Sequence, residues 1–111
     1  MQVSNNEGVI EFGTAGAGPP VIMLPGRGGS GPEQFGVLGP AVVAAGFRAI
    51  AINPRGVGLS SGPVEQLTLH DLARDVAFVI ASIGGPAHIV GRALGNRVAR
   101  CFAVDYPQAV R

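Results

Sequence analysis

The sequence is poor in cysteine, in aromatic residues and in charge. It contains one cysteine, Cys101, so an intrachain disulfide is excluded and a reducing compartment is the simplest interpretation. The 111 residues include no tryptophan, and aromatic residues make up 5% of the chain, which leaves few platforms for stacking nucleic-acid bases. All 8 basic residues are arginines, and they are scattered along the chain. This distribution indicates neither nucleic acid nor an acidic membrane surface as a partner.

Long apolar runs are also missing. The longest apolar stretch, residues 76–83, is much shorter than a bilayer-spanning helix. Residues 1–8 are polar and lack the apolar centre of a signal peptide. We therefore expect a soluble, cytoplasmic protein with no membrane partner, whose oligomeric state the sequence leaves open.

The chain does contain many glycines, prolines and apolar residues. Its 18 glycines and 9 prolines lie mostly in short clusters between apolar runs, and 47% of the residues are hydrophobic. Such clusters are typical of turns between buried elements. The low charged fraction, 14%, suits an α/β protein whose parallel strands are covered on both faces.

Strand and helix patterns alternate along the chain. Short apolar runs predict strands at residues 9–12, 21–24, 47–52 and 87–90, and helical periodicity predicts helices at residues 32–45, 69–83 and 96–105. Thr68, followed by Asp71, has the spacing of a capping box at the start of the second helix. This order predicts an open, mostly parallel α/β sheet with flanking helices and right-handed crossovers.

The predicted sheet has an uncovered edge. The sequence stops just after the third helix, which would leave about four strands. We expect residues 1–111 to be the N-terminal portion of a single domain, truncated after this helix, and the isolated chain to be marginally stable or prone to aggregate.

A sharp strand-to-helix turn is predicted at Gly91-Arg92-Ala93-Leu94-Gly95. Its spacing is that of the nucleophile elbow G-x-S-x-G, in which a strained central residue projects its side chain above the sheet. The flanking residues are glycines because the helix backbone passes close to the strand. The central residue of this chain is alanine.

From Gly8 to Arg111 the chain resembles the α/β-hydrolase superfamily. The resemblance rests on the strand and glycine loop of residues 21–29, the loop of residues 53–60, the helix of residues 69–83, and the elbow with its following helix. The departures are Pro25, where the family often has histidine, Asn53, where it often has aspartate, and Ala93, where it has Ser, Asp or Cys.

The resemblance implies a hydrolase of ester-like bonds in which Ala93 marks a non-functional nucleophile position. It also implies an oxyanion hole made by the backbone N–H groups of Arg27 and Leu94. Gly26, Gly28 and Arg92 would line the pocket, and the family's acid and histidine would lie beyond residue 111. We expect catalysis to be impaired or absent, while a small ester-like or carbonyl ligand could still bind.

Two alternatives remain open from the sequence. One is a non-catalytic, ligand-binding or scaffolding homologue with the hydrolase fold. The other is a Rossmann-type dinucleotide-binding domain, because Gly26, Gly28 and Gly31 match G-x-G-x-x-G after a buried strand. The ribose-binding position would then hold Asn53, not an acidic residue.

The remaining polar residues have ordinary structural interpretations. Arg55 is expected to anchor its loop, and His70 and His88 are not expected to act as general bases. Cys101 is expected to be a small buried hydrophobe. No cluster of His, Cys, Asp and Glu has metal-ligand spacing in the sequence, so neither a metal nor a cofactor is predicted.

Overall fold

The structure is a computed structural model that describes all 111 residues. The strands are β1 (Gln2–Ser4), β2 (Val9–Ala15), β3 (Pro20–Leu24), β4 (Arg48–Ile52) and β5 (His88–Gly91). The helices are α1 (Gly31–Gln34), α2 (Leu38–Ala44), α3 (Leu69–Ile83) and α4 (Leu94–Asp105), followed by the 3₁₀ turn η1 (Pro107–Ala109). None of the helices is long and apolar enough to span a membrane.

The five strands form one open sheet in the order β1-β2-β4-β3-β5. β3 pairs in parallel with β4 and β5, so Ile22 lies opposite Ile50 on one side and Ile89 on the other. β2 is antiparallel to both β1 and β4. The sheet is therefore less parallel than the sequence predicts, because the short connections before and after β2 reverse the chain direction, whereas parallel neighbours need a crossover.

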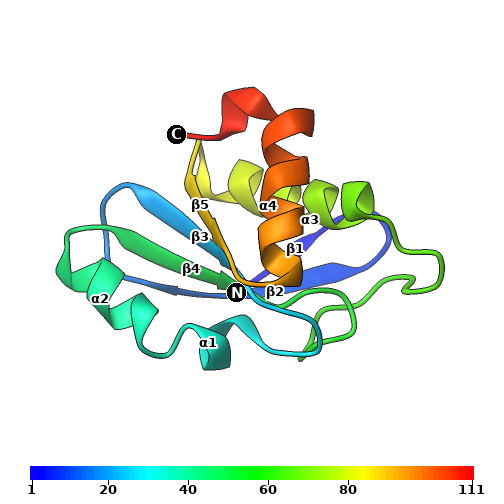
Figure 1. Cartoon of the computed structure of the whole chain (residues 1–111), viewed down its shortest axis with the longest axis horizontal. Helices are drawn as coiled ribbons and strands as arrows, with labels where there is room; N and C mark the ends of the chain where they lie inside the picture. Colours follow the sequence, from blue (N-terminus) through cyan, green and yellow to red (C-terminus); the bar gives the residue numbers. More distant parts are fainter.

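Helices cover both faces of the sheet, with α1 and α2 on one side and α3 and α4 on the other (Figure 1). In β3 and β4, Ile22, Leu24, Ile50 and Ile52 join the larger core with α3 and α4. The alternate residues of the same strands (Val21, Met23, Ala49 and Ala51) join Phe35 in a second core. The continuous apolar runs arise because alternate residues of each strand enter different cores.

Helix α3 occupies the predicted range. The Thr68 hydroxyl accepts a hydrogen bond from the Asp71 N–H at 3.1 Å, and the Asp71 carboxylate accepts one from the Thr68 N–H at 3.0 Å. Gly84 ends the helix in a left-handed conformation with φ of 91°. The predicted capping box and glycine stop are both confirmed.

The single helix predicted over residues 32–45 is wrong. The segment forms two short helices, α1 and α2, separated by residues 35–37. In a continuous helix, Pro40 would remove one N–H donor and clash with the Gly36 carbonyl; in α2 it lies in the first turn, where proline is tolerated. Phe35 at the break is buried in the second core, which stabilises the interruption.

The other differences between the predicted and the observed strands and helices are small. β1 is not predicted, because its three residues are mostly exposed and carry no apolar alternation. β2 extends to Ala15, and α4 begins at Leu94, directly after Ala93.

Candidate functional site

The turn between β5 and α4, residues 91–95, has an unusual backbone. Ala93 has φ of 52° and ψ of −115°, a conformation that favours glycine, and it immediately precedes the first residue of α4. Its side chain is exposed. Such strain, about 1–3 kcal/mol, persists only where the surrounding structure imposes it.

The glycines on either side of Ala93 allow this close approach. A Cβ atom on Gly91 would overlap the backbone carbonyl of Gly95, and a Cβ atom on Gly95 would overlap the carbonyl of Leu24. The first turn of α4 therefore lies directly against the end of β3. The backbone of residues 91–95 leaves no room for a larger residue at either position.

The loop between β3 and α1, residues 25–30, packs against this turn. The Gly26 N–H donates to Gln34 Oε1 at 2.7 Å, and a Cβ atom at Gly26 would lie 3.4 Å from that of Ala93. Gly28 has φ of 74°, which a larger residue would adopt only with strain. Gln34 was not singled out from the sequence, since its contact with Gly26 depends on how the loop packs against α1.

A cleft of about 470 Å³ opens beside the loop and the turn. Gly26, Arg27, Gly28 and Leu94 line one part of it, together with Arg97 of α4. Its remaining lining comes from the residue 53–68 segment and the start of α3 (Pro54, Arg55, Val57, Val64, Leu67, Thr68, Leu69 and Leu72). Arg92 and Ala93 are exposed and lie outside the cleft lining.

Several backbone N–H groups at this cleft have no acceptor within the chain, and those of Arg27 and Leu94 are among them. Two nearby N–H groups are engaged: Arg92 donates to the Leu24 carbonyl at 3.0 Å, and Gly95 donates to the Arg92 carbonyl at 2.8 Å. A polar atom entering the cleft is thus the natural partner for both free donors.

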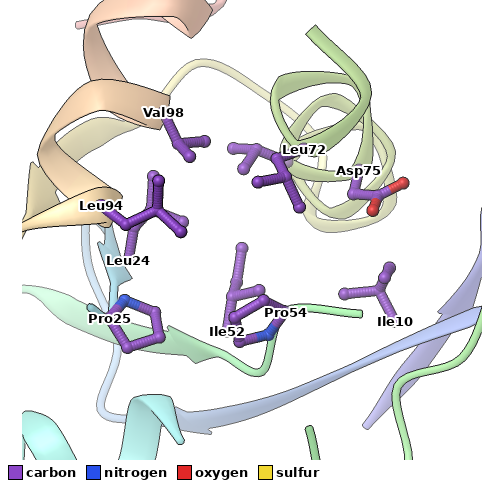
Figure 2. Close-up of a pocket in the computed structure, with 11 residues that line it drawn as sticks. Ile10, Leu24, Pro25, Ile52, Pro54, Leu72, Asp75, Leu94 and Val98 are labelled. Carbon is purple, nitrogen blue, oxygen red and sulfur yellow. The ribbon is translucent and has the colours of Figure 1, made fainter. Parts of the chain in front are cut away.

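The side chain of Leu94 is directed into the interior. Figure 2 shows it facing Val98, Leu24 and Leu72 around an apolar cavity of about 40 Å³. This volume has room for only a few atoms, and 7 of its 11 lining residues are hydrophobic. The cavity therefore lies beneath the cleft, and Leu94 lines both of them.

The loop that follows β4 is anchored by Arg55. Its guanidinium donates to Asp75 on α3 through Nε at 2.7 Å and Nη2 at 3.1 Å, and to the Pro63 carbonyl at 3.1 Å. The Asp75 hydrogen bonds raise the pKa of Arg55 above its ordinary value, so the guanidinium stays charged. Arg55 anchors its loop, as the sequence predicts.

The dinucleotide alternative lacks the structural features it requires. The glycine loop leads into α1, which is four residues long and offers only a weak helix dipole. Asn53 is buried, and its side chain bonds the Gly31 N–H at 3.0 Å and Glu11 at 2.8 Å. It is therefore not available to bind a ribose.

Three residues that the sequence does not group together meet where α3 packs on α4. His70, Cys101 and Asp105 place one potential ligand atom each within 4.8 Å of one another. Cys101 is half-buried and not fully buried as the sequence predicts. The sequence does not reveal this cluster, because His70 and Cys101 are 31 positions apart and meet only when α3 packs on α4.

We expect Ala93→Gly to stabilise the protein by about 1 kcal/mol. Glycine would relieve the strain at φ of 52°, although its larger unfolded-state entropy offsets part of the gain. Urea unfolding monitored by circular dichroism measures the change. Ala99→Gly, within α4, is the control and should destabilise by about 1 kcal/mol; equal losses in both variants would contradict the strain at residue 93.

Comparisons with known proteins agree with this architecture. The family model for the alpha/beta hydrolase fold matches residues 19–111. A 2-hydroxy-6-oxo-6-phenylhexa-2,4-dienoate hydrolase from Burkholderia cepacia is 37% identical over 105 residues, which cover 89% of this chain and 36% of the relative. The chain thus spans well under half the length of the curated relatives it matches.

Solved structures extend the likeness to three dimensions. Rv0554 from Mycobacterium tuberculosis superimposes with a TM-score of 0.84 at 32% identity, covering 92% of this chain and 37% of that one. An epoxide hydrolase from an endophytic Streptomyces gives a TM-score of 0.92 at 29% identity, covering 99% of this chain and 34% of that one. With its sheet order, its strained turn at Ala93 and a family match over most of its length, the chain belongs to the α/β hydrolase family.

Proposed function

We propose that residues 91–95 are the nucleophile elbow of this α/β hydrolase and that Ala93 occupies the nucleophile's place. The observation that carries the proposal is the backbone of Ala93, with φ of 52° and ψ of −115° between β5 and α4. In the family this turn presents the attacking atom above the sheet. A methyl group has no lone pair, so the elbow forms no acyl-enzyme intermediate.

Neighbouring hydroxyl groups do not replace the missing nucleophile. Thr68, which lines the cleft, exchanges hydrogen bonds with Asp71 in the α3 capping box. Ser60 donates to the Asn53 carbonyl at 2.6 Å and accepts from the Glu11 N–H at 2.8 Å. Both hydroxyls are held by structural partners, so serine-hydrolase activity of this chain should be negligible.

The proposed ligand site is an oxyanion hole formed by the N–H groups of Arg27 and Leu94. Support comes from their unpaired state and from their shared position on the cleft lined by Gly26 and Gly28. Backbone donors do not depend on the side chain at residue 93. The site suits a small molecule with an ester-like or carbonyl oxygen, and Arg97 on the same cleft favours an anionic one.

The remainder of the assignment follows from the family. We assign residues 1–111 to the N-terminal portion of a single hydrolase domain, which agrees with a match to 34–37% of the structural relatives cited above. The resemblance to the family implies that its acid and histidine lie beyond residue 111. A cytoplasmic location suits a chain with one cysteine.

Titration of the ¹⁵N-labelled chain with acetate tests the oxyanion hole, since a carboxylate oxygen mimics the oxyanion. The Arg27 and Leu94 amide resonances should shift saturably. The Arg92 amide, already bonded to Leu24, is the internal control. If the Arg27 and Leu94 resonances do not move, ligand binding at this site is refuted and the scaffolding alternative is favoured.

Hydrolysis of p-nitrophenyl acetate by a full-length version of the protein, which would also carry the family's acid and histidine, tests the missing nucleophile. The native chain should not exceed the rate of a heat-denatured sample. Turnover that a phosphonate inhibitor abolishes would overturn the role assigned to Ala93. Ala93→Ser provides the comparison: activity gained by this variant alone would place the nucleophile position at residue 93.

A further inference from the structure

The strongest feature outside the cleft is the cluster of His70, Cys101 and Asp105. His70 lies in the first turn of α3, and Cys101 and Asp105 lie four residues apart on α4, a spacing that puts both on one helix face. His70 Nδ1 is 2.6 Å from Asp105 Oδ2 and 3.4 Å from Cys101 Sγ, and Sγ is 3.6 Å from Oδ2.

These separations are close to those of ligands around one tetrahedral ion. With metal–sulfur bonds of about 2.3 Å and metal–nitrogen or metal–oxygen bonds of about 2.0 Å, tetrahedral geometry places sulfur about 3.5 Å from its nitrogen and oxygen neighbours. The two distances from Cys101 Sγ already match, at 3.4 and 3.6 Å. Only the His70–Asp105 contact must widen, and the His70 side chain, 69% exposed, is free to move.

The same geometry argues against a catalytic Cys-His-Asp triad. In a triad the two ring nitrogens of histidine face opposite partners, one the nucleophile and the other the acid. Here both Cys101 and Asp105 approach Nδ1. Three donors that converge on one point suit an ion placed between them.

We propose that His70, Cys101 and Asp105 form a binding site for Zn²⁺ or a similar borderline-soft divalent ion, with solvent as the fourth ligand. Imidazole nitrogen, thiolate sulfur and carboxylate oxygen are the donors that Zn²⁺ takes in proteins. The thiolate and the carboxylate balance its charge. Asp105 also lies at the C-terminal end of α4, where the helix dipole favours a cation.

The ion would link the two helices that hold the cleft. α3 supplies His70 near its start and α4 supplies the other two ligands near its end. An ion that binds only when α3 and α4 are packed together stabilises the folded state. The ion would hold these two helices together and so stabilise the turn at Ala93, from which α4 begins. Its role would be structural.

Binding of Zn²⁺ to the untagged, reduced chain tests the site by competition with a chromophoric chelator, with Co²⁺ as an optical probe. We expect one ion per chain, a thiolate-to-cobalt charge-transfer band and an increase in Tm. Cys101→Ser should abolish the band and weaken Zn²⁺ binding at least about tenfold, since even loss of an outer partner costs that much at a metal site. His70→Gln should weaken binding similarly.

His88→Gln is the matched control, because the other histidine packs edge-on against Phe47 and lies outside the cluster. It should bind Zn²⁺ like the native chain. His70 is exposed, so His70→Gln should fold normally, as its circular dichroism spectrum in EDTA will verify. Absence of saturable binding at millimolar Zn²⁺, or unchanged binding in both Cys101→Ser and His70→Gln, would overturn the proposal.

Discussion

Arg55→Ala should lower the free energy of unfolding by about 3–5 kcal/mol. The guanidinium is 2% exposed and makes a two-point ion pair with Asp75, whose side chain is 5% exposed. Without Arg55, the Asp75 carboxylate remains buried with Asn5 as its one remaining side-chain donor. Uncompensated burial of a charge is the source of the large cost.

Arg74→Ala is the control for Arg55. Arg74 also pairs with Glu7 and with Asp71, but its side chain is 47% exposed. Its removal should cost less than about 1 kcal/mol, because solvent screens exposed pairs. Chemical denaturation of the two variants measures the difference, and similar losses would contradict a buried anchor at Arg55.

Gly95→Ala should destabilise the protein by about 3 kcal/mol, the upper end of the cost of overpacking. The added Cβ would overlap the backbone carbonyl of Leu24, and a backbone atom cannot move aside as a flexible side chain can. To relieve this overlap, α4 must move away from β3. That movement would separate the N–H groups of Leu94 and Arg27, so the acetate-induced amide shifts should weaken as well.

Gly85→Ala is the matched control for Gly95. Nothing lies within 4 Å of a Cβ atom at Gly85, and its φ is not positive. The Tm of this variant should lie within a few degrees of that of the native protein. A substitution whose new atoms meet no neighbour usually alters stability by less than about 0.5 kcal/mol. A mild effect of Gly95→Ala, comparable with that of Gly85→Ala, would show that α4 does not lie against β3.

Signals that are local in the sequence predicted much of the fold. Thr68, Asp71 and Gly84 determine both ends of α3 because their cap hydrogen bonds and backbone preferences act within a few residues. The apolar runs of β3 and β4 predicted strands buried on both faces. By contrast, the prediction of one helix over residues 32–45 missed the break between α1 and α2, which Pro40 and the burial of Phe35 explain.

The sequence likewise predicted some features of the candidate site and not others. The glycine spacing around Ala93 predicted a strained turn, because close backbone approach restricts residue size whatever the rest of the chain does. The sequence could not indicate that Gln34 holds the Gly26 amide or that the Arg27 and Leu94 amides are left unpaired at one cleft. Those relations depend on how the loops pack.

By itself, then, the sequence determined the alternation of strands and helices, the position of the turn and the methyl group at residue 93. Only the tertiary structure decided the order of the strands and the meeting of His70 with Cys101 and Asp105. The physical reason is range: caps, turns and periodicity act between near neighbours in the chain, whereas strand pairing and side-chain clusters join residues that are brought together only when the cores form.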